Sequence, residues 1–297
     1  MITAAQALDR INGVYGRHTG ARTLHAKGQF FAGTFTATPE SAALCRAGHL
    51  QDAPVPVWVR WSNGSGHPRV KDGSPDVRGM AVSFRLPDGT ATDLLGQTAP
   101  RFPVRTPEDF VKLVEASSSP LKLPLFIASH PGTLPSFLAN AKAKSVVSPR
   151  SFAEVAYFPI HAYQWIAADG STSWVRYTLE PTATPANRPS GEFSGRDRLF
   201  EEIAARLDQA PVRFTLRVQV AGPDDDPHDP TSVWGKHARS FDGGTIEVTA
   251  PDPAREQDGE VVVFDPTRVV DGIELSEDPI LLFRAPAYSE SVARRLA

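Results

Sequence analysis

Two arginines and one tyrosine near the C-terminal end of the sequence have a spacing that could support chemistry. Arg284 lies four residues before Tyr288 and Arg295 lies seven residues after it, so the three share one face of a helix predicted over residues 278–296. A phenol loses its proton only near pH ~10, and a guanidinium held against it favours the phenolate. One use of a phenolate in a protein is the ligation of ferric iron. A surface helix with ion pairs has the same spacing, so the motif alone leaves both interpretations open.

Residues that could move or hold a proton lie in the first third of the chain. His25 follows Arg22 closely, and imidazole is the side chain that titrates nearest neutral pH, as a proton shuttle requires. A lone histidine held by the backbone at the start of a strand is the competing interpretation. Arg60 and Ser62 end one expected strand, and Gln97 follows a later apolar run. These neighbours favour a pocket over an isolated histidine.

Alternating apolar residues predict the strands that must position this chemistry. The clearest strand covers residues 212–220, where every second residue is apolar and the residues between them are polar. Several short helices punctuated by prolines are expected across residues 106–157. Eight or so strands joined by hairpin turns favour an α+β fold built on an antiparallel eight-stranded β-barrel with surrounding helices, because closure leaves no exposed edge. The other expected strands cover residues 55–61, 80–86, 163–167, 173–179, 244–248 and 261–264, and the other expected helices cover residues 198–207 and 278–296.

Length and composition fit one globular domain over residues 1–297. A net charge of −3 gives no broad field for nucleic acid or anionic lipid, so neither partner is expected. The single cysteine, Cys45, excludes an internal disulfide and a cysteine-rich metal site. The N-terminal segment does not resemble a secretion signal, and no apolar run is long enough to cross a membrane, so a cytoplasmic location is expected.

Six short motifs, taken in order, resemble the catalase family. The histidine lies in Arg22-Thr-Leu-His-Ala-Lys-Gly28, and the tyrosine lies in Arg284-Ala-Pro-Ala-Tyr288, ahead of Arg295. The four motifs between them are Val59-Arg-Trp-Ser62, Asp76-Val-Arg-Gly-Met-Ala-Val82, Phe264-Asp-Pro-Thr267 and Gly272-Ile-Glu-Leu-Ser276. The resemblance covers residues 22–295, and it implies the catalase-core fold with bound haem b.

The resemblance also implies a role for each candidate residue. Tyr288 would be the axial ligand of ferric haem, and His25 would be the base that moves the peroxide proton. Ser62 would orient the imidazole, and Gln97 stands where the family has a distal asparagine. The implied cofactor-binding residues are Arg22, Arg60 and Arg295 toward the haem propionates, Phe102 and Phe110 beside the porphyrin, and Arg284 backed by His161 and Asp278.

The glutamine at position 97 changes the activity that the resemblance implies. Gln97 keeps the amide donor but adds a methylene and a rotor, so it would hold the second peroxide needed for dismutation less firmly. We therefore predict a haem peroxidase that takes hydrogen peroxide or organic hydroperoxides, with a small organic reductant as its other partner. The alternatives are true catalase activity, rearrangement of fatty-acid hydroperoxides, and haem binding or storage without catalysis. Termini shorter than those of large catalases predict a monomer or a homodimer.

Overall fold

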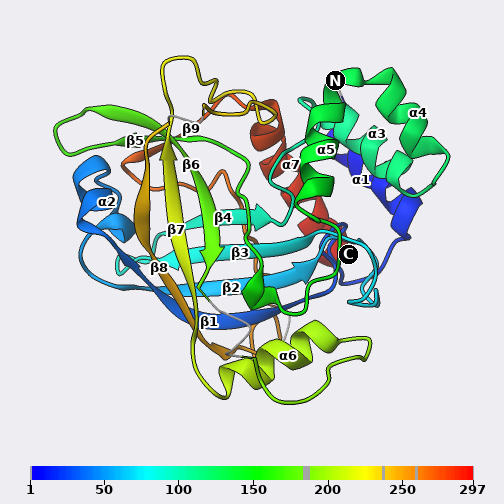
Figure 1. Ribbon diagram of the computed structural model, residues 1–297, viewed down its shortest axis with the longest axis horizontal. Coiled ribbons are helices and arrows are strands. Elements are labelled where there is room, and N and C mark those ends of the chain that lie inside the picture. The colour runs from blue at the N-terminus through cyan, green and yellow to red at the C-terminus, as the bar shows by residue number, and fades with distance from the viewer. Residues whose placement is uncertain (1, 183–187, 236–237, 258–259, 297) are drawn as a thin grey trace.

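Six of the expected strands and three others form one curled antiparallel sheet, and most of the helices gather on one side of it (Figure 1). The computed structural model describes residues 2–182, 188–235, 238–257 and 260–296. The order across the sheet is β4-β3-β2-β1-β8-β7-β6-β5-β9, and every neighbouring pair is antiparallel. The strands are β1 (Gly28–Ala37), β2 (Val55–Asn63), β3 (Arg78–Arg85), β4 (Ala91–Gln97), β5 (Tyr163–Ile166), β6 (Thr172–Pro181), β7 (Val212–Val220), β8 (Ser240–Pro251) and β9 (Ile273–Leu275).

The alternation of side chains places the main core against one face of the sheet. In β7, Val212 and Phe214 are buried while Arg213 between them is exposed. The fully buried ring of Trp61 in β2 lies 4.7 Å from the ring of Phe31 and 6.1 Å from that of Phe214, measured between centroids. Because burying a large apolar side chain contributes about 1.5–3 kcal/mol, this face is a main source of stability.

The α+β class is confirmed, but the sheet is a half-barrel of nine strands rather than the expected barrel of eight. Six of the expected strands are present, and β1, β4 and β9 complete the nine within the described residues. The outer side of β4 meets irregular segments: Gln97 pairs with Phe158 in an isolated bridge, and the Asp93 N–H donates to the Arg268 carbonyl at 3.3 Å. These segments bond to backbone groups on the free edge of β4, which another strand would have paired if the sheet closed into a barrel.

The strand expected over residues 261–264 is wrong. The segment is irregular, although Val262 and Phe264 are buried against Phe30 of β1. Side chains use its backbone groups instead, since the Val262 carbonyl accepts a hydrogen bond from Arg22 at 2.8 Å. The apolar alternation here reflects burial of one face without a partner strand.

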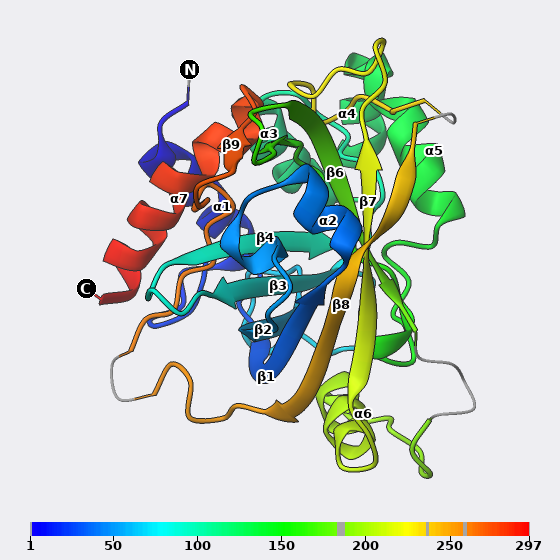
Figure 2. The same ribbon diagram turned by 90° about the vertical axis from the view of Figure 1, so that its left-hand side faces the viewer.

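The helical predictions hold for most of the chain. The proline-punctuated region contains several short helices, and helix α6 has the expected bounds. Figures 1 and 2 show α1, α3 and α7 together on one side of the sheet and α6 apart from them. Among the described residues, no helix combines the length and the apolar character needed to cross a bilayer. The helices are α1 (Ala4–Tyr15), α2 (Pro39–Leu44), α3 (Pro107–Ser117), α4 (Lys122–Ser129), α5 (Leu134–Lys142), α6 (Arg198–Leu207) and α7 (Pro279–Leu296), with short 3-10 turns at Gly48–Leu50, Pro131–Thr133 and Phe152–Glu154.

Helix α1 is an element that the sequence analysis did not predict. Thr3 and Gln6 form a capping box, in which each side chain accepts a hydrogen bond from the backbone N–H of the other. The apolar face of α1 packs Ala7 and Ile11 against Val111 of α3. Helix α1 also packs on α7, so the N-terminal helix lies beside the C-terminal helix.

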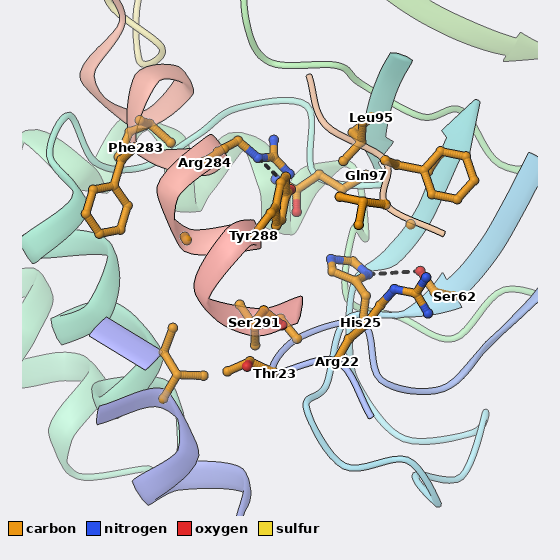
Figure 3. Close-up of a pocket in the computed structure, with 18 of the residues that line it drawn as sticks. Arg22, Thr23, His25, Ser62, Leu95, Gln97, Phe283, Arg284, Tyr288 and Ser291 are labelled. Carbon is orange, nitrogen blue, oxygen red and sulfur yellow. Dashed lines mark hydrogen bonds between the residues drawn. The ribbon is translucent and has the colours of Figure 1, made fainter. Parts of the chain in front are cut away.

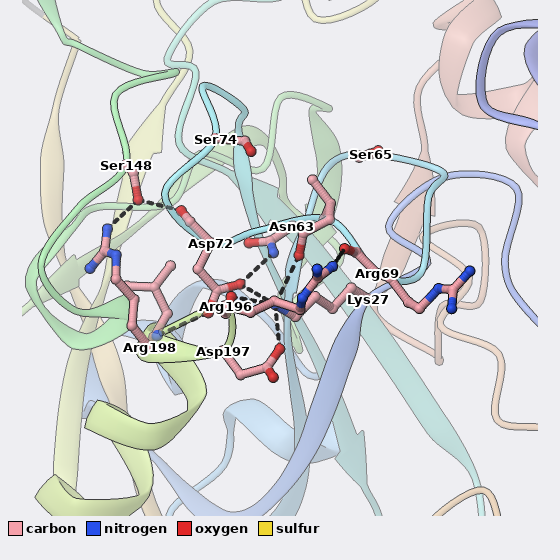
Figure 4. Close-up of polar contacts among 12 residues, drawn as sticks. Lys27, Asn63, Ser65, Arg69, Asp72, Ser74, Ser148, Arg196, Asp197 and Arg198 are labelled. Atoms are coloured by element: carbon pink, nitrogen blue, oxygen red, sulfur yellow. Dashed lines mark hydrogen bonds and ion pairs between the residues drawn. The ribbon is translucent and has the colours of Figure 1, made fainter. Parts of the chain in front are cut away.

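A buried polar network holds Lys27 and Asn63 (Figure 4), which follow His25 and Ser62 closely in the sequence. Asp72 is fully buried, and its carboxylate accepts hydrogen bonds from Lys27 at 2.6 Å, Asn63 at 2.7 Å and the backbone N–H of Leu199 at 2.9 Å. Breaking a buried pair of this kind costs about 3–5 kcal/mol, because one charge is left without a partner. The network thus ties the starts of β1 and α6 and the end of β2 into one rigid unit.

Candidate active site

A cavity of about 270 Å³ opens between the sheet and helices α1, α3 and α7 (Figure 3). Most of its wall is apolar, and the polar groups are concentrated on two facing sides. Ten of the twelve candidate residues line it, namely Arg22, His25, Arg60, Ser62, Gln97, Phe102, Phe110, Arg284, Tyr288 and Arg295. The other two, His161 and Asp278, lie behind the α7 wall.

On the α7 side, four residues form a continuous chain of polar contacts. The Arg284 Nε donates to the Tyr288 Oη at 2.8 Å, and the Arg284 Nη1 lies 3.1 Å from the His161 Nε2. The His161 Nδ1 lies 2.6 Å from an oxygen of Asp278. Because Arg284 can only donate, Nε2 must accept, and the His161 proton is therefore on Nδ1, facing Asp278. Asp278 and His161 are both buried, so they fix the guanidinium plane against the phenol.

Burial opposes the effect that Arg284 has on the protonation of Tyr288. Burial raises the pKa of Tyr288 above its ordinary value, although the charge and the hydrogen bond of Arg284 act to lower it. The phenol is thus neutral in the protein alone. A further cation at the phenol oxygen is needed to hold the anion.

On the opposite side, His25 and Ser62 form a second polar pair. The His25 Nδ1 lies 3.0 Å from the Ser62 Oγ, and the backbone of His25 adopts a left-handed conformation with φ of 54°. Burial lowers the pKa of His25 to about 3, and the positive charges of Arg60, Arg284 and Arg22 act in the same direction. The imidazole is therefore neutral at physiological pH and available as a base.

Gly79 of β3 makes room for this pair. A Cβ at position 79 would lie 2.7 Å from the Ser62 Oγ and 2.8 Å from the His25 ring, which is closer than non-bonded atoms tolerate. Sequence reasoning did not assign Gly79 a role, because the clash depends on three separate segments. Its position inside a strand was the available signal, since glycine there often marks a close approach.

We expect Gly79→Ala to separate His25 from Ser62. Overpacking of this kind costs about 1–3 kcal/mol of unfolding free energy. The rate of the peroxide reaction that the sequence predicts should fall by more than tenfold, or about 1.4 kcal/mol in barrier height. Urea unfolding and stopped-flow spectroscopy measure the two effects. Gly73→Ala is the matched control, because a Cβ there meets no atom within 4 Å; equal behaviour of the two variants would contradict the close approach.

Three arginines give the cavity a cationic rim. Arg22, Arg60 and Arg295 all line it, and the Arg60 Nη1 donates to the His25 carbonyl at 3.0 Å. The Nε atoms of Arg60 and Arg295 are buried without a hydrogen-bond partner among the described residues. A buried guanidinium N–H without an acceptor is costly, so the rim fits a ligand that brings carboxylates. Gly28 is required here, because a Cβ would lie 2.5 Å from the Arg60 guanidinium.

Aromatic and apolar groups complete the wall between the two polar sides. The rings of Phe102 and Phe110 are stacked with centroids 5.6 Å apart. Gln97, at the end of β4, lines the cavity, and its side chain has no hydrogen bond to the described residues. The lining residues that sequence reasoning missed include Ala7, Leu8 and Ile11 of α1 and Phe283 of α7. The capped amphipathic pattern of residues 3–15 was a signal that could have revealed the first three.

These features fit one class of ligand. An apolar slot with stacked rings, a cationic rim and a tyrosine backed by arginine suits a flat aromatic group that carries carboxylates and a metal ion, as haem does.

Comparisons with known proteins agree with this class. The family model described as Catalase matches residues 2–297. The chain is 46% identical to a catalase-related peroxidase of Mycolicibacterium paratuberculosis, over 99% of this chain and 95% of that protein. It is 28% identical to a catalase-related peroxidase of Synechococcus elongatus, over 99% and 89% of the two chains, and 26% identical to a catalase of Staphylococcus saprophyticus, over 93% and 60%. The chain belongs to the catalase family. Membership makes it an oxidoreductase that acts on peroxide, and it implies a haem cofactor.

Proposed function

We propose that the protein is a single-domain haem peroxidase that uses hydrogen peroxide or organic hydroperoxides to oxidise a small organic donor. Tyr288 would be the axial ligand of ferric haem b. The observation that carries the proposal is the pair of facing polar groups across one cavity, His25 with Ser62 on one side and Arg284 with Tyr288 on the other. The names of the two catalase-related peroxidases that resemble the chain support a peroxidase.

The residues of the cavity divide the tasks of holding the cofactor. Haem, when bound, supplies the iron at which the peroxide O–O bond is broken. Arg60 and Arg295 offer buried N–H groups to its carboxylates. Phe102 and Phe110, whose rings stack on each other in the cavity wall, would pack on its apolar surface. Asp278, through His161, holds Arg284 so that its Nε faces the phenol oxygen and stabilises the ligand as an anion.

His25 moves the proton. If Nδ1 carries the hydrogen and donates it to the Ser62 Oγ, Nε2 is free to accept a proton from the attacking peroxide oxygen. The same nitrogen then returns that proton to the departing oxygen, so water or an alcohol leaves. Because the pKa of His25 is about 3, the imidazole is in the basic form when peroxide arrives.

The side chain of Gln97 favours peroxidase activity over dismutation. Dismutation requires a second hydrogen peroxide to be held by both the imidazole and the amide. The Gln97 side chain has no hydrogen bond to the described residues, so no such bond fixes the direction of its amide. A small organic donor needs no such placement. Dismutation remains the second candidate, because the His25–Ser62 pair serves it equally well.

The test compares oxygen release from hydrogen peroxide with donor oxidation driven by tert-butyl hydroperoxide. We expect donor oxidation to dominate in the wild type. Gln97→Asn, which shortens the side chain, should shift the ratio toward oxygen release by about tenfold, or 1.4 kcal/mol in relative barrier height. Gln219→Asn on β7 is the matched control outside the cavity. Dominant oxygen release by the wild type would refute the peroxidase proposal.

A further inference from the structure

A carboxylate of the chain itself already occupies the arginine rim of the cavity. Glu256, in the segment after β8, accepts hydrogen bonds from the Arg22 Nη1 at 2.8 Å and from the Arg22 Nη2 at 2.5 Å. The same carboxylate lies 3.2 Å from the Arg295 Nη1. The two arginine side chains are 19% and 9% exposed, so these are partly desolvated contacts rather than surface pairs.

The pairing with Arg22 is the one that a haem carboxylate would need. A guanidinium binds a carboxylate best through two parallel N–H···O bonds, and Glu256 accepts such bonds from both Nη atoms of Arg22. The Arg22 Nη2 also donates to the Val262 carbonyl at 2.8 Å, so both of its hydrogens are used. Arg22 cannot bind a second carboxylate in this way while Glu256 remains in place.

Glu256 is also the anion that holds three neighbouring cations together. Burial lowers the pKa of Arg60 well below its ordinary value, and the charges of Arg22 and Arg295 lower it further, while Glu256 acts in the opposite direction. Glu256 supplies one negative charge against the three positive charges of the guanidiniums, and a haem carboxylate that replaced it at Arg22 would supply the same charge. Without haem, the cluster depends on Glu256 for compensation.

The local backbone is arranged to present this carboxylate. Glu256 adopts a left-handed conformation with φ of 62°, which is unfavourable for a residue with a side chain. The backbone N–H of Val262 donates to its Oε1 at 3.2 Å, and the backbone N–H of Glu256 donates to Glu260 at 3.2 Å. The side chain is thus directed at the rim by its own segment.

We propose that Glu256 stands in for a haem carboxylate when the site is free and is displaced from Arg22 when haem binds. The inference rests on the proposed haem site. Glu256 compensates the arginines in the haem-free chain and competes with the cofactor for them. It therefore makes the haem-free protein more stable and the release of haem faster.

The charge of Glu256 can be removed without changing its shape. In Glu256→Gln, transfer of haem from the loaded protein to apomyoglobin, followed by absorption, should be slower by about tenfold, which corresponds to 1.4 kcal/mol. Thermal unfolding of the haem-free variant should occur at a lower temperature than that of the wild type. Glu247→Gln is the matched control. Glu247 lies on β8, the strand before Glu256, and its replacement removes an exposed ion pair with Arg213 of β7.

The outcomes separate this inference from the proposed function. A wild-type protein that binds no haem would refute the haem site itself. A wild type that binds haem, with equal transfer rates in Glu256→Gln and Glu247→Gln, would refute the displacement of Glu256 alone. Faster haem loss in Glu256→Gln would also refute it, because that result would make Glu256 a support for the bound cofactor.

Discussion

Tyr288→Phe is expected to yield a protein that has lost its haem or holds it with an altered absorption spectrum. The variant keeps the ring but removes the oxygen on which Arg284 converges at 2.8 Å. Loss of a partner outside the ligand shell typically costs 10–100-fold in metal affinity or activity. Loss of the ligand itself should therefore lower peroxide-driven activity by more than about a hundredfold. Absorption spectra and iron content measure the effect.

Tyr157→Phe is a suitable control for the loss of a phenol. Tyr157 is fully buried and donates to the Phe152 carbonyl at 2.8 Å, but it does not line the cavity. Its replacement should cost about 1 kcal/mol of stability and leave the haem spectrum unchanged. If Tyr288→Phe instead retains the wild-type spectrum and iron content, Tyr288 is not the ligand and the proposed site fails at its centre.

The parts of the fold that the sequence predicts well are those with a regular repeat. The strand over 212–220 and the helix over 198–207 have the bounds that their patterns predict, because each buries one face against the same core. The segment around Val262 shows where a repeat misleads. Its alternate residues are buried, but its backbone is used by Arg22 and Arg268, and the sequence carries no sign of such partners.

In the candidate site, too, the sequence predicts contacts within one regular element better than contacts between separate segments. Arg284 and Tyr288 meet because four residues make about one helical turn, and this contact follows from spacing. His25 and Ser62 come from different elements, so their contact was predicted only from the resemblance of their motifs to a known family. Glu256 belongs to no motif. Its contacts with residues 22 and 295 depend on the path of an irregular segment, which neither periodicity nor resemblance describes.

His25→Ala is expected to lower the rate of reaction with peroxide by about 10²–10⁴-fold, the range typical of a lost general base. Haem binding should persist, because the rim arginines and Tyr288 are unchanged. Stopped-flow spectroscopy of the loaded protein measures the rate, and its absorption spectrum measures the haem. His130→Ala is the control, since that histidine stacks on Phe126 outside the cavity. Equal rates in the two variants would remove His25 from the mechanism.

The pH dependence of the wild type offers an independent test of the same residue. An unperturbed histidine would be protonated below about pH 6.5, and a base with that pKa would lose activity as the pH falls through it. The pKa of His25 is lowered to about 3 by burial and by the nearby arginines, so the neutral form persists to much lower pH. A bound porphyrin adds burial and acts in the same direction. The rate of peroxide reaction should therefore stay level between about pH 5 and 8, the range in which folded proteins are usually most stable. A fall centred near pH 6.5 would mean that the imidazole is solvated and that the cavity does not close around it.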